Sequence, residues 1–209
     1  MRRYRICQAA AAVLLAAITS ACGAARPYQY YELEIAPPVP AAPAAPLPVT
    51  ILVGRVVTSH LYHDDRIVYG SGSQMGAYEY NRWAQMPTDI VQDALVTSLR
   101  ATGQYRAVTR IGSSARGDYI LRTQLLGFCE IDKSPATARF SISAELFDPK
   151  TGATVWTGSY SHDQPAEGKS VSGVVEAMNQ NVHDGIQQLA AGIGQYFASH
   201  PPETTPAAH

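Results

Sequence analysis

Residues 138–147 read ARFSISAELF, in which apolar and polar side chains alternate from Ala138 to Leu146. Successive side chains of an extended strand point to opposite faces of its sheet. One face of this segment would therefore carry Phe140, Ile142, Ala144 and Leu146, and the other its arginine, serines and glutamate. Such alternation is typical of an antiparallel sheet with one buried and one hydrated face.

Residues 119–131 repeat the pattern and predict a second strand beside the first. Six of its side chains are assigned to the buried face: Tyr119, Leu121, Thr123, Leu125, Cys129 and Ile131. Arg122, Gln124 and Glu130 are assigned to the hydrated face. The turn sequence 148–152, DPKTG, leads from 138–147 into a third strand at 154–161.

Upstream of these strands, further segments rich in β-branched and aromatic residues predict strands at 28–35, 50–58, 66–69 and 77–80. The last two flank the sequence GSGS at 70–73, which suits a hairpin. A helix is predicted over 87–102, with Pro87 in its first turn and Gly103 just beyond its end. An apolar stripe at helical spacing predicts a second, long helix over 171–197. The predicted fold is α+β: a mainly antiparallel sheet covered on one face by two helices, the C-terminal one long.

The N-terminus has the layout of an export signal. Arg2, Arg3 and Arg5 precede a short apolar run that ends in ITSAC, residues 18–22. This run is too short for a membrane span, which needs about 20 apolar residues. A cysteine after small residues resembles a bacterial lipoprotein signal, in which Cys22 becomes the lipidated first residue. Thr19 stands where such signals usually carry leucine, so an ordinary signal with an incidental cysteine is the alternative.

These features predict the organisation of the whole chain. We expect a signal peptide at 1–21, a lipidated N-terminus at 22–27, one domain at 28–198 and a disordered tail at 199–209. The domain includes a proline- and alanine-rich connection at 36–48, which proline should keep extended.

Charge and cysteine content exclude some functions. The chain has 16 basic and 17 acidic side chains, a net charge of −1. Because no basic patch is available for phosphate backbones, we predict no nucleic-acid partner. Once Cys7 leaves with the leader and Cys22 carries lipid, Cys129 has no partner for a disulfide and should be a buried, inert thiol.

The sequence offers little for catalysis. His60, His63, Asp64 and Asp65 lie close together and could hold a metal, but a solvated loop is the favoured interpretation. The sequence contains neither the G-x-S-x-G nucleophile elbow nor a phosphate-binding P-loop. We therefore predict a protein that is not an enzyme and has no metal or cofactor.

Residues 78–83, YEYNRW, form the candidate site for a partner. Tyrosine, tryptophan and arginine dominate binding hot spots, so Tyr78, Tyr80, Arg82 and Trp83 could form a docking surface. The alternative is that Trp83 fills the core where the sheet meets the first helix, as most such tryptophans do.

Three motifs give the chain a family resemblance: LYHDDRIVY at 61–69, YEYNRWA at 78–84 and YYEL at 30–33. Together with the cysteine signal, they make it similar to the ABC-type transport auxiliary lipoproteins (PqiC-like). The resemblance implies a non-catalytic envelope component that works with an ATPase, a permease and a periplasmic MCE protein in lipid transport. Gly23 after Cys22 is compatible with delivery to the outer membrane. The resemblance thus implies a lipid anchor on the periplasmic face of that membrane.

Other functions stay open at the level of sequence. A lipoprotein that activates or assembles cell-wall or outer-membrane machinery, with no transport role, is the main alternative. A direct lipid carrier is a third possibility and would need an apolar cavity. A homo-oligomer is also conceivable, for instance a ring if the partner is a ring.

Overall fold

The computed structural model describes residues 26–36, 45–112, 116–168 and 170–202. The predicted signal peptide, Cys22, most of the proline- and alanine-rich connection and residues 203–209 lie outside this part. None of the helices in the described ranges is both long and apolar enough to cross a membrane.

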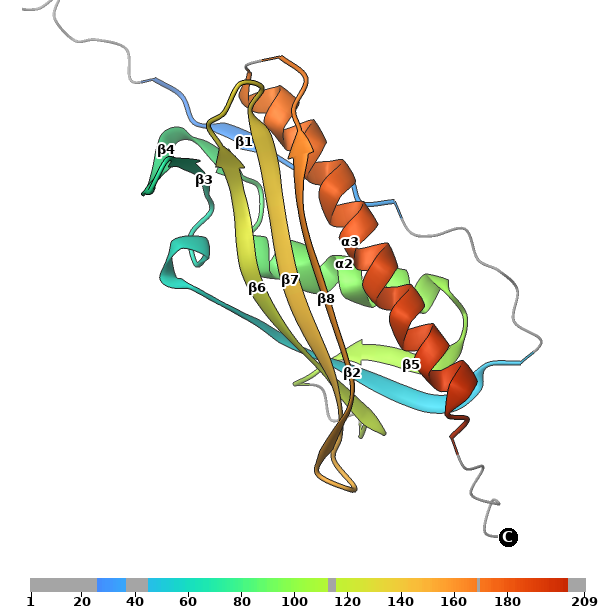
Figure 1. The fold of residues 1–209 in the computed structure, drawn as a ribbon. Helices are drawn as coiled ribbons and strands as arrows, with labels where there is room; N and C mark the ends of the chain where they lie inside the picture. The colour runs from blue at the N-terminus through green and yellow to red at the C-terminus, as the bar shows by residue number, and fades with distance from the viewer. Residues whose placement is uncertain (1–25, 37–44, 113–115, 169, 203–209) are drawn as a thin grey trace, which may run out of the picture.

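Two α-helices, one short 3-10 helix and eight strands make up the described fold (Figure 1). Their order along the chain is β1 (Gln29–Tyr31), β2 (Leu47–Thr58), the short 3-10 helix η1 (His60–Tyr62), β3 (Arg66–Ser71), β4 (Gln74–Trp83), α2 (Pro87–Ala101), β5 (Tyr105–Arg110), β6 (Tyr119–Ile131), β7 (Thr137–Asp148), β8 (Ala153–Pro165) and α3 (Val171–Ser199). The predicted α+β class, the long C-terminal helix and the hairpin of β3 and β4 are confirmed.

Two features of the sheet differ from the prediction. The strand β5 was not expected, because YRAVTR is short and its buried and exposed residues do not alternate cleanly; it pairs in parallel with β2. The sheet is also mixed: its long ladders β6–β7 and β7–β8 are antiparallel, whereas β1–β4, β2–β5, β2–β6 and β3–β6 are parallel. Parallel pairs join segments that are distant in sequence, so no local turn signal reports them.

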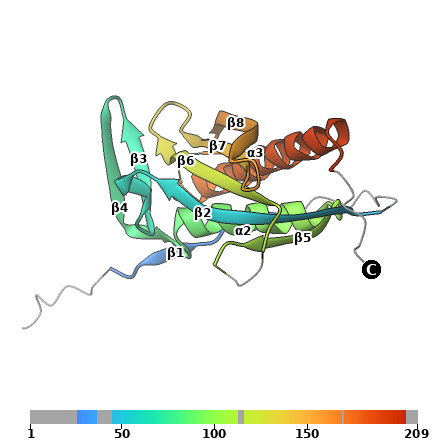
Figure 2. The ribbon, with the colours of Figure 1, turned by 90° about the horizontal axis from the view of Figure 1, so that it is seen from below.

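Strand β6 is the axis of the sheet. Along one edge it pairs with β7 over its whole length. Along the other edge, residues 119–125 pair with β2, and residues 129–131 pair with β3. The sheet therefore divides beyond β6 into two branches, one of β2 and β5 and one of β3, β4 and β1 (Figures 1 and 2).

A β-bulge in β6 lies between the two branches and changes which side chains face the core. The register with β7 shifts between Leu125 and Gly127. Beyond the shift, Phe128 lies opposite Phe140 on the core face, and Cys129 lies opposite Arg139 on the other. The predicted placement of Cys129 and Ile131 on the same face as Leu125 is thus wrong, because the inserted residue reverses the alternation.

Cys129 is nonetheless buried, at 2% exposure, as predicted. The 3-10 helix η1 carries Tyr62 over it on this face, and Tyr62 is itself buried. Burial raises the pKa of the Cys129 thiol, and burial beside that thiol raises the pKa of Tyr62 to about 12. Both groups are therefore neutral at physiological pH.

The two α-helices cover different parts of the sheet. Helix α2 packs on β2 and β5, α3 packs on β7 and β8, and the helices also contact each other (Figure 2). At the C-terminal end of α3, Phe197 packs edge-on against Tyr119 of β6 and Tyr105 of β5. The core is continuous from one helix to the other.

Helix α3 also carries one fully buried polar side chain, Asn181. Its amide nitrogen donates to the carbonyl oxygens of Ala138, at 2.8 Å, and His162, at 2.9 Å. Its carbonyl oxygen accepts a hydrogen bond of 2.7 Å from the Tyr160 hydroxyl. Asn181 thereby fixes α3 to both β7 and β8, in a core where an unpaired polar group would be costly.

Candidate docking surface

The four residues predicted to bind a partner lie on β4, but the structure places them in different environments. Trp83 is 1% exposed and meets Phe128 edge to face, with ring centroids 5.2 Å apart. Its backbone N–H donates to the carbonyl oxygen of Asp65 at 2.6 Å, where β4 ends. Trp83 thus belongs to the core and is removed from the docking surface, as the alternative interpretation of this residue had it.

Tyr78 holds the β3–β4 hairpin against the rest of the sheet. Its hydroxyl donates to the Glu130 carboxylate at 2.9 Å, and its ring lies 5.0 Å from that of Tyr69. Burial and the adjacent carboxylate both raise the pKa of Tyr78 above its ordinary value. Tyr78 is half-buried and serves to position the hairpin.

Tyr80 and Arg82 meet residues from the start of the described chain. Strand β1 pairs in parallel with β4, so that Tyr30 lies opposite Arg82. The ring of Tyr28 then lies 5.9 Å from that of Tyr80 and 4.6 Å from the Arg82 guanidinium carbon. The Arg26 guanidinium carbon lies 5.1 Å over the Tyr80 ring. We call Arg26, Tyr28, Tyr30, Tyr80 and Arg82 the tyrosine–arginine surface.

This surface presents large aromatic area to solvent. Tyr28 is 52% exposed and Tyr30 is 62% exposed. Arginines stacked over tyrosine rings keep their planar N–H donors available at the edge of the stack. Rigid aromatic side chains with adjoining guanidinium groups are the residue types that supply most of the binding energy at protein interfaces.

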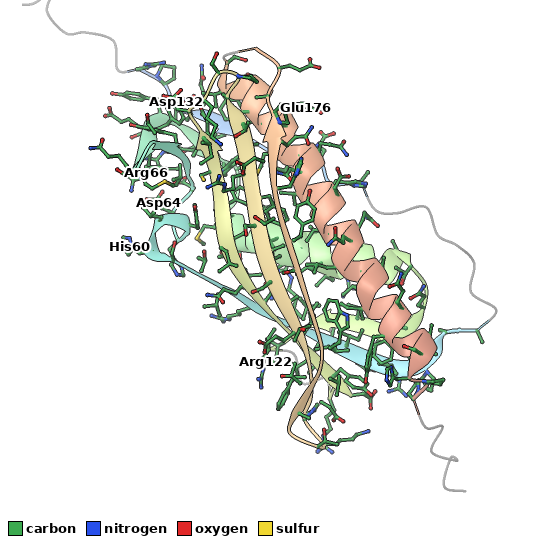
Figure 3. All side chains as sticks on the ribbon, in the orientation of Figure 1. His60, Asp64, Arg66, Arg122, Asp132 and Glu176 are labelled. Carbon is green, nitrogen blue, oxygen red and sulfur yellow. The ribbon has the colours of Figure 1, made fainter. Side chains whose placement is uncertain are left out.

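Ion pairs behind the surface hold Arg82 in place. Its guanidinium bonds to the carboxylate of Asp65 at 2.5 Å. The neighbouring Asp64 accepts from the backbone N–H of Arg66 at 2.9 Å and from its guanidinium at 3.0 Å (Figure 3). The backbone N–H of Arg66 is the main reason that the pKa of Asp64 lies below its ordinary value.

The ion pairs of Asp64 and Asp65 also concern the metal site that these aspartates could have formed with His60 and His63. Both aspartates face arginines, and His60 lies apart from Asp64 in Figure 3. In the residues that the structure describes, no three His, Cys, Asp or Glu side chains come together as metal ligands.

Arg26, Tyr28 and Tyr30 were missed as site residues, although a strand was predicted at 28–35. Their position beside Tyr80 and Arg82 depends on the parallel pairing of β1 with β4, some fifty positions further along the chain. The dense tyrosines of this segment were the available signal, but nothing local links them to Tyr80 or Arg82.

Comparison with known proteins places this fold in a family. A family model described as "ABC-type transport auxiliary lipoprotein component" matches residues 31–193. A solved Xanthomonas campestris protein of family DUF330 is similar at a TM-score of 0.71 and 22% identity, over 82% of this chain and 99% of that one. A second solved structure, of an uncharacterised protein, has a TM-score of 0.60 at 16% identity, over 81% and 98% of the two chains. No curated protein matches the sequence.

Proposed function

The chain belongs to the family of ABC-type transport auxiliary lipoproteins, and on this premise we propose that it is an outer-membrane-anchored accessory subunit of an MCE-type lipid transport system. In this role it is not a catalyst. It docks to a periplasmic MCE protein, which works with its own permease and ATPase, and thereby contributes to envelope integrity.

The exposed tyrosine–arginine surface is the observation that carries the docking role. Its tyrosine rings lie next to one another across β1 and β4, tilted by 53° and 35°, with Tyr28 and Tyr30 more than half exposed. Arg82 is 23% exposed and already oriented by Asp65, so a partner would meet a preformed site.

The position of the surface along the chain supports the proposed anchor. Arg26 follows Cys22 by four residues, which span at most about 14 Å when fully extended. A lipid on Cys22 would therefore hold the tyrosine–arginine surface close to the membrane. A transporter subunit that reaches this membrane would meet the surface there.

Crosslinked purification from membranes tests the docking role. The protein should recover an MCE protein, and the double variant Tyr30→Ala/Tyr80→Ala should recover much less of it. Met75→Ala is the matched control, because Met75 is a 43% exposed apolar side chain on the same hairpin and outside the surface. Recovery of peptidoglycan synthases without an MCE protein would contradict the proposal and favour the cell-wall alternative.

The anchor is tested separately with Cys22→Ser. This variant should keep the circular dichroism spectrum of the folded domain and appear in the soluble fraction. Retention on membranes after a high-salt wash would refute the lipid anchor.

A further inference from the structure

The outer face of the sheet, turned away from α2 and α3, carries an open groove of about 650 Å³. Small-molecule sites commonly measure roughly 300 to 1,000 Å³. The groove runs over β2 and β6 beside the end of β5, and its lining includes Arg55, Val57, Ile111, Ile120, Arg122 and Glu145. It lies on the β2–β5 branch and thus apart from the tyrosine–arginine surface.

The apolar floor of the groove consists of three side chains, Val57, Ile111 and Ile120, and the polar side chains of Thr123, Gln124 and Ser143 also line it. Val57 is 63% exposed and Ile111 is 42% exposed. Ile120 lies opposite Phe147 in the β6–β7 ladder on the same face. Leu126, 53% exposed, lies in the bulge of β6 and is not part of the lining. Exposed apolar side chains that line one groove mark a binding surface more often than scattered ones do.

Two arginines, Arg55 and Arg122, stand beside this floor. Arg122 stacks on the ring of Phe147, 3.7 Å from its centroid, and Figure 3 shows it beside the strands on the side away from α3. Glu145 also lines the groove and lies opposite Arg122 in the ladder. Among the ion pairs of the described residues, none involves Arg55 or Arg122. Guanidinium groups without an ion pair can bind an anion, and arginine is well suited to phosphate.

The hydrogen bonding of the strands indicates what can occupy the groove. Strands β6 and β7 of its floor are paired on both edges, whereas β2 beyond Val53 pairs with β6 alone. A peptide could therefore add a strand only at that free edge of β2, and not across the floor, where the backbone groups that it would need are already bonded. An acyl chain needs no hydrogen bonds and gains from leaving water.

We infer that this groove binds one acyl chain of an anionic phospholipid, with the chain on the apolar floor and the phosphate at Arg55 and Arg122. The inference specifies which class of lipid the proposed transport system would handle, and it therefore rests on the proposed function. It also gives the chain a direct contact with lipid, which docking alone does not require.

Photocrosslinking of the full-length protein in cells tests this site. The photoreactive residue p-benzoylphenylalanine replaces Val57 on the groove floor, and in a control protein it replaces Met75, which lies on the other branch of the sheet. Intact-mass analysis of the purified protein then identifies any adduct. We expect adducts of anionic phospholipid at position 57 and none at position 75.

The charge requirement is tested with Arg55→Gln/Arg122→Gln in the protein that carries the probe at position 57. Loss of the two phosphate contacts should reduce the lipid adduct about fivefold or more, as expected for about 1 kcal/mol of binding energy. The matched control is Arg66→Gln, a partly exposed arginine outside the groove, which should leave the adduct unchanged.

Three results would overturn the inference. They are equal lipid adducts at positions 57 and 75, adducts that match bulk membrane lipid regardless of head-group charge, and adducts at position 57 with protein only, including a second copy of this chain. The two proposals fail separately: an MCE protein recovered without a lipid adduct rejects the groove, and a lipid adduct without an MCE protein rejects the docking role.

Discussion

Replacement of Asn181 by alanine should be among the most damaging single changes in this domain. The side chain is fully buried and makes three hydrogen bonds, two to strand carbonyl groups and one with the Tyr160 hydroxyl. Each bond contributes about 1 kcal/mol net, and a buried group left without a partner costs about 1 to 3 kcal/mol more. Because Ala138 is itself fully buried, water cannot replace the donor at its carbonyl group.

These terms predict that Asn181→Ala lowers the free energy of unfolding by about 3 to 5 kcal/mol. In a chain of this length, that corresponds to a fall in Tm of about 6 to 20 °C. The measurement is urea unfolding followed by circular dichroism, in a background that carries Cys22→Ser. The slope of free energy against urea should stay constant, since the surface exposed on unfolding hardly changes.

Two further variants make the argument refutable. Gln180→Ala, at the neighbouring position, removes an exposed side chain that bonds only to Asp184 on the same helix, and it should cost less than about 0.5 kcal/mol. Tyr160→Phe should cost about 1 kcal/mol and be non-additive with Asn181→Ala, because both remove the same hydrogen bond. A loss below about 1 kcal/mol for Asn181→Ala, or full additivity of the pair, would show that Asn181 does not fix α3 to the strands.

Three other predictions concern the sheet and its cover. The guanidinium of Arg139 bonds to Asp163 at 2.7 and 2.8 Å and lowers the pKa of the Asp163 carboxyl group. The contribution of this ion pair to stability is therefore present above the ordinary pKa of 3.8 and disappears as pH falls through the lower pKa of the folded state. Asp163→Asn should therefore flatten the acid limb of the curve of unfolding free energy against pH, and an unchanged curve would contradict this. Cys129, buried under Tyr62 with its pKa raised, should react with Ellman's reagent only in denaturant, whereas rapid reaction in native buffer would show that the cover opens. Gly185→Ala should destabilise the protein by about 1 to 3 kcal/mol in thermal unfolding despite the better helix propensity, because the new Cβ would lie 2.7 Å from two aromatic rings of the sheet; a gain in Tm would refute that close packing.

The features predicted correctly from the sequence are those set by residues that lie close together along the chain. Residues 138–147 and the two helices were predicted well, because alternation and helical spacing are local properties that burial on one face imposes directly. The hairpin at 70–73 was predicted for the same reason, since its turn residues lie next to the strands that they join.

The features that failed were those that depend on distant partners. The short strand β5 is held by its parallel neighbour β2, and its own sequence does not alternate cleanly. The bulge that moves Cys129 to the outer face serves the change of partner from β2 to β3 along β6, which no local pattern reports. The outer-face groove lies beside another irregularity of this kind, since β2 shifts register between Val53 and Val56.

The amino-acid sequence by itself therefore determined the α+β class, the long final helix, the family resemblance and Tyr80 and Arg82 as candidate docking residues. Only the tertiary structure decided that Trp83 lies in the core, that Tyr28 and Tyr30 join Tyr80 and Arg82 in one exposed surface, and that a groove lined in part by Arg55 and Arg122 crosses the outer face. The physical reason is that local periodicity encodes which face of a segment is buried, whereas a site arises where segments distant in sequence pair.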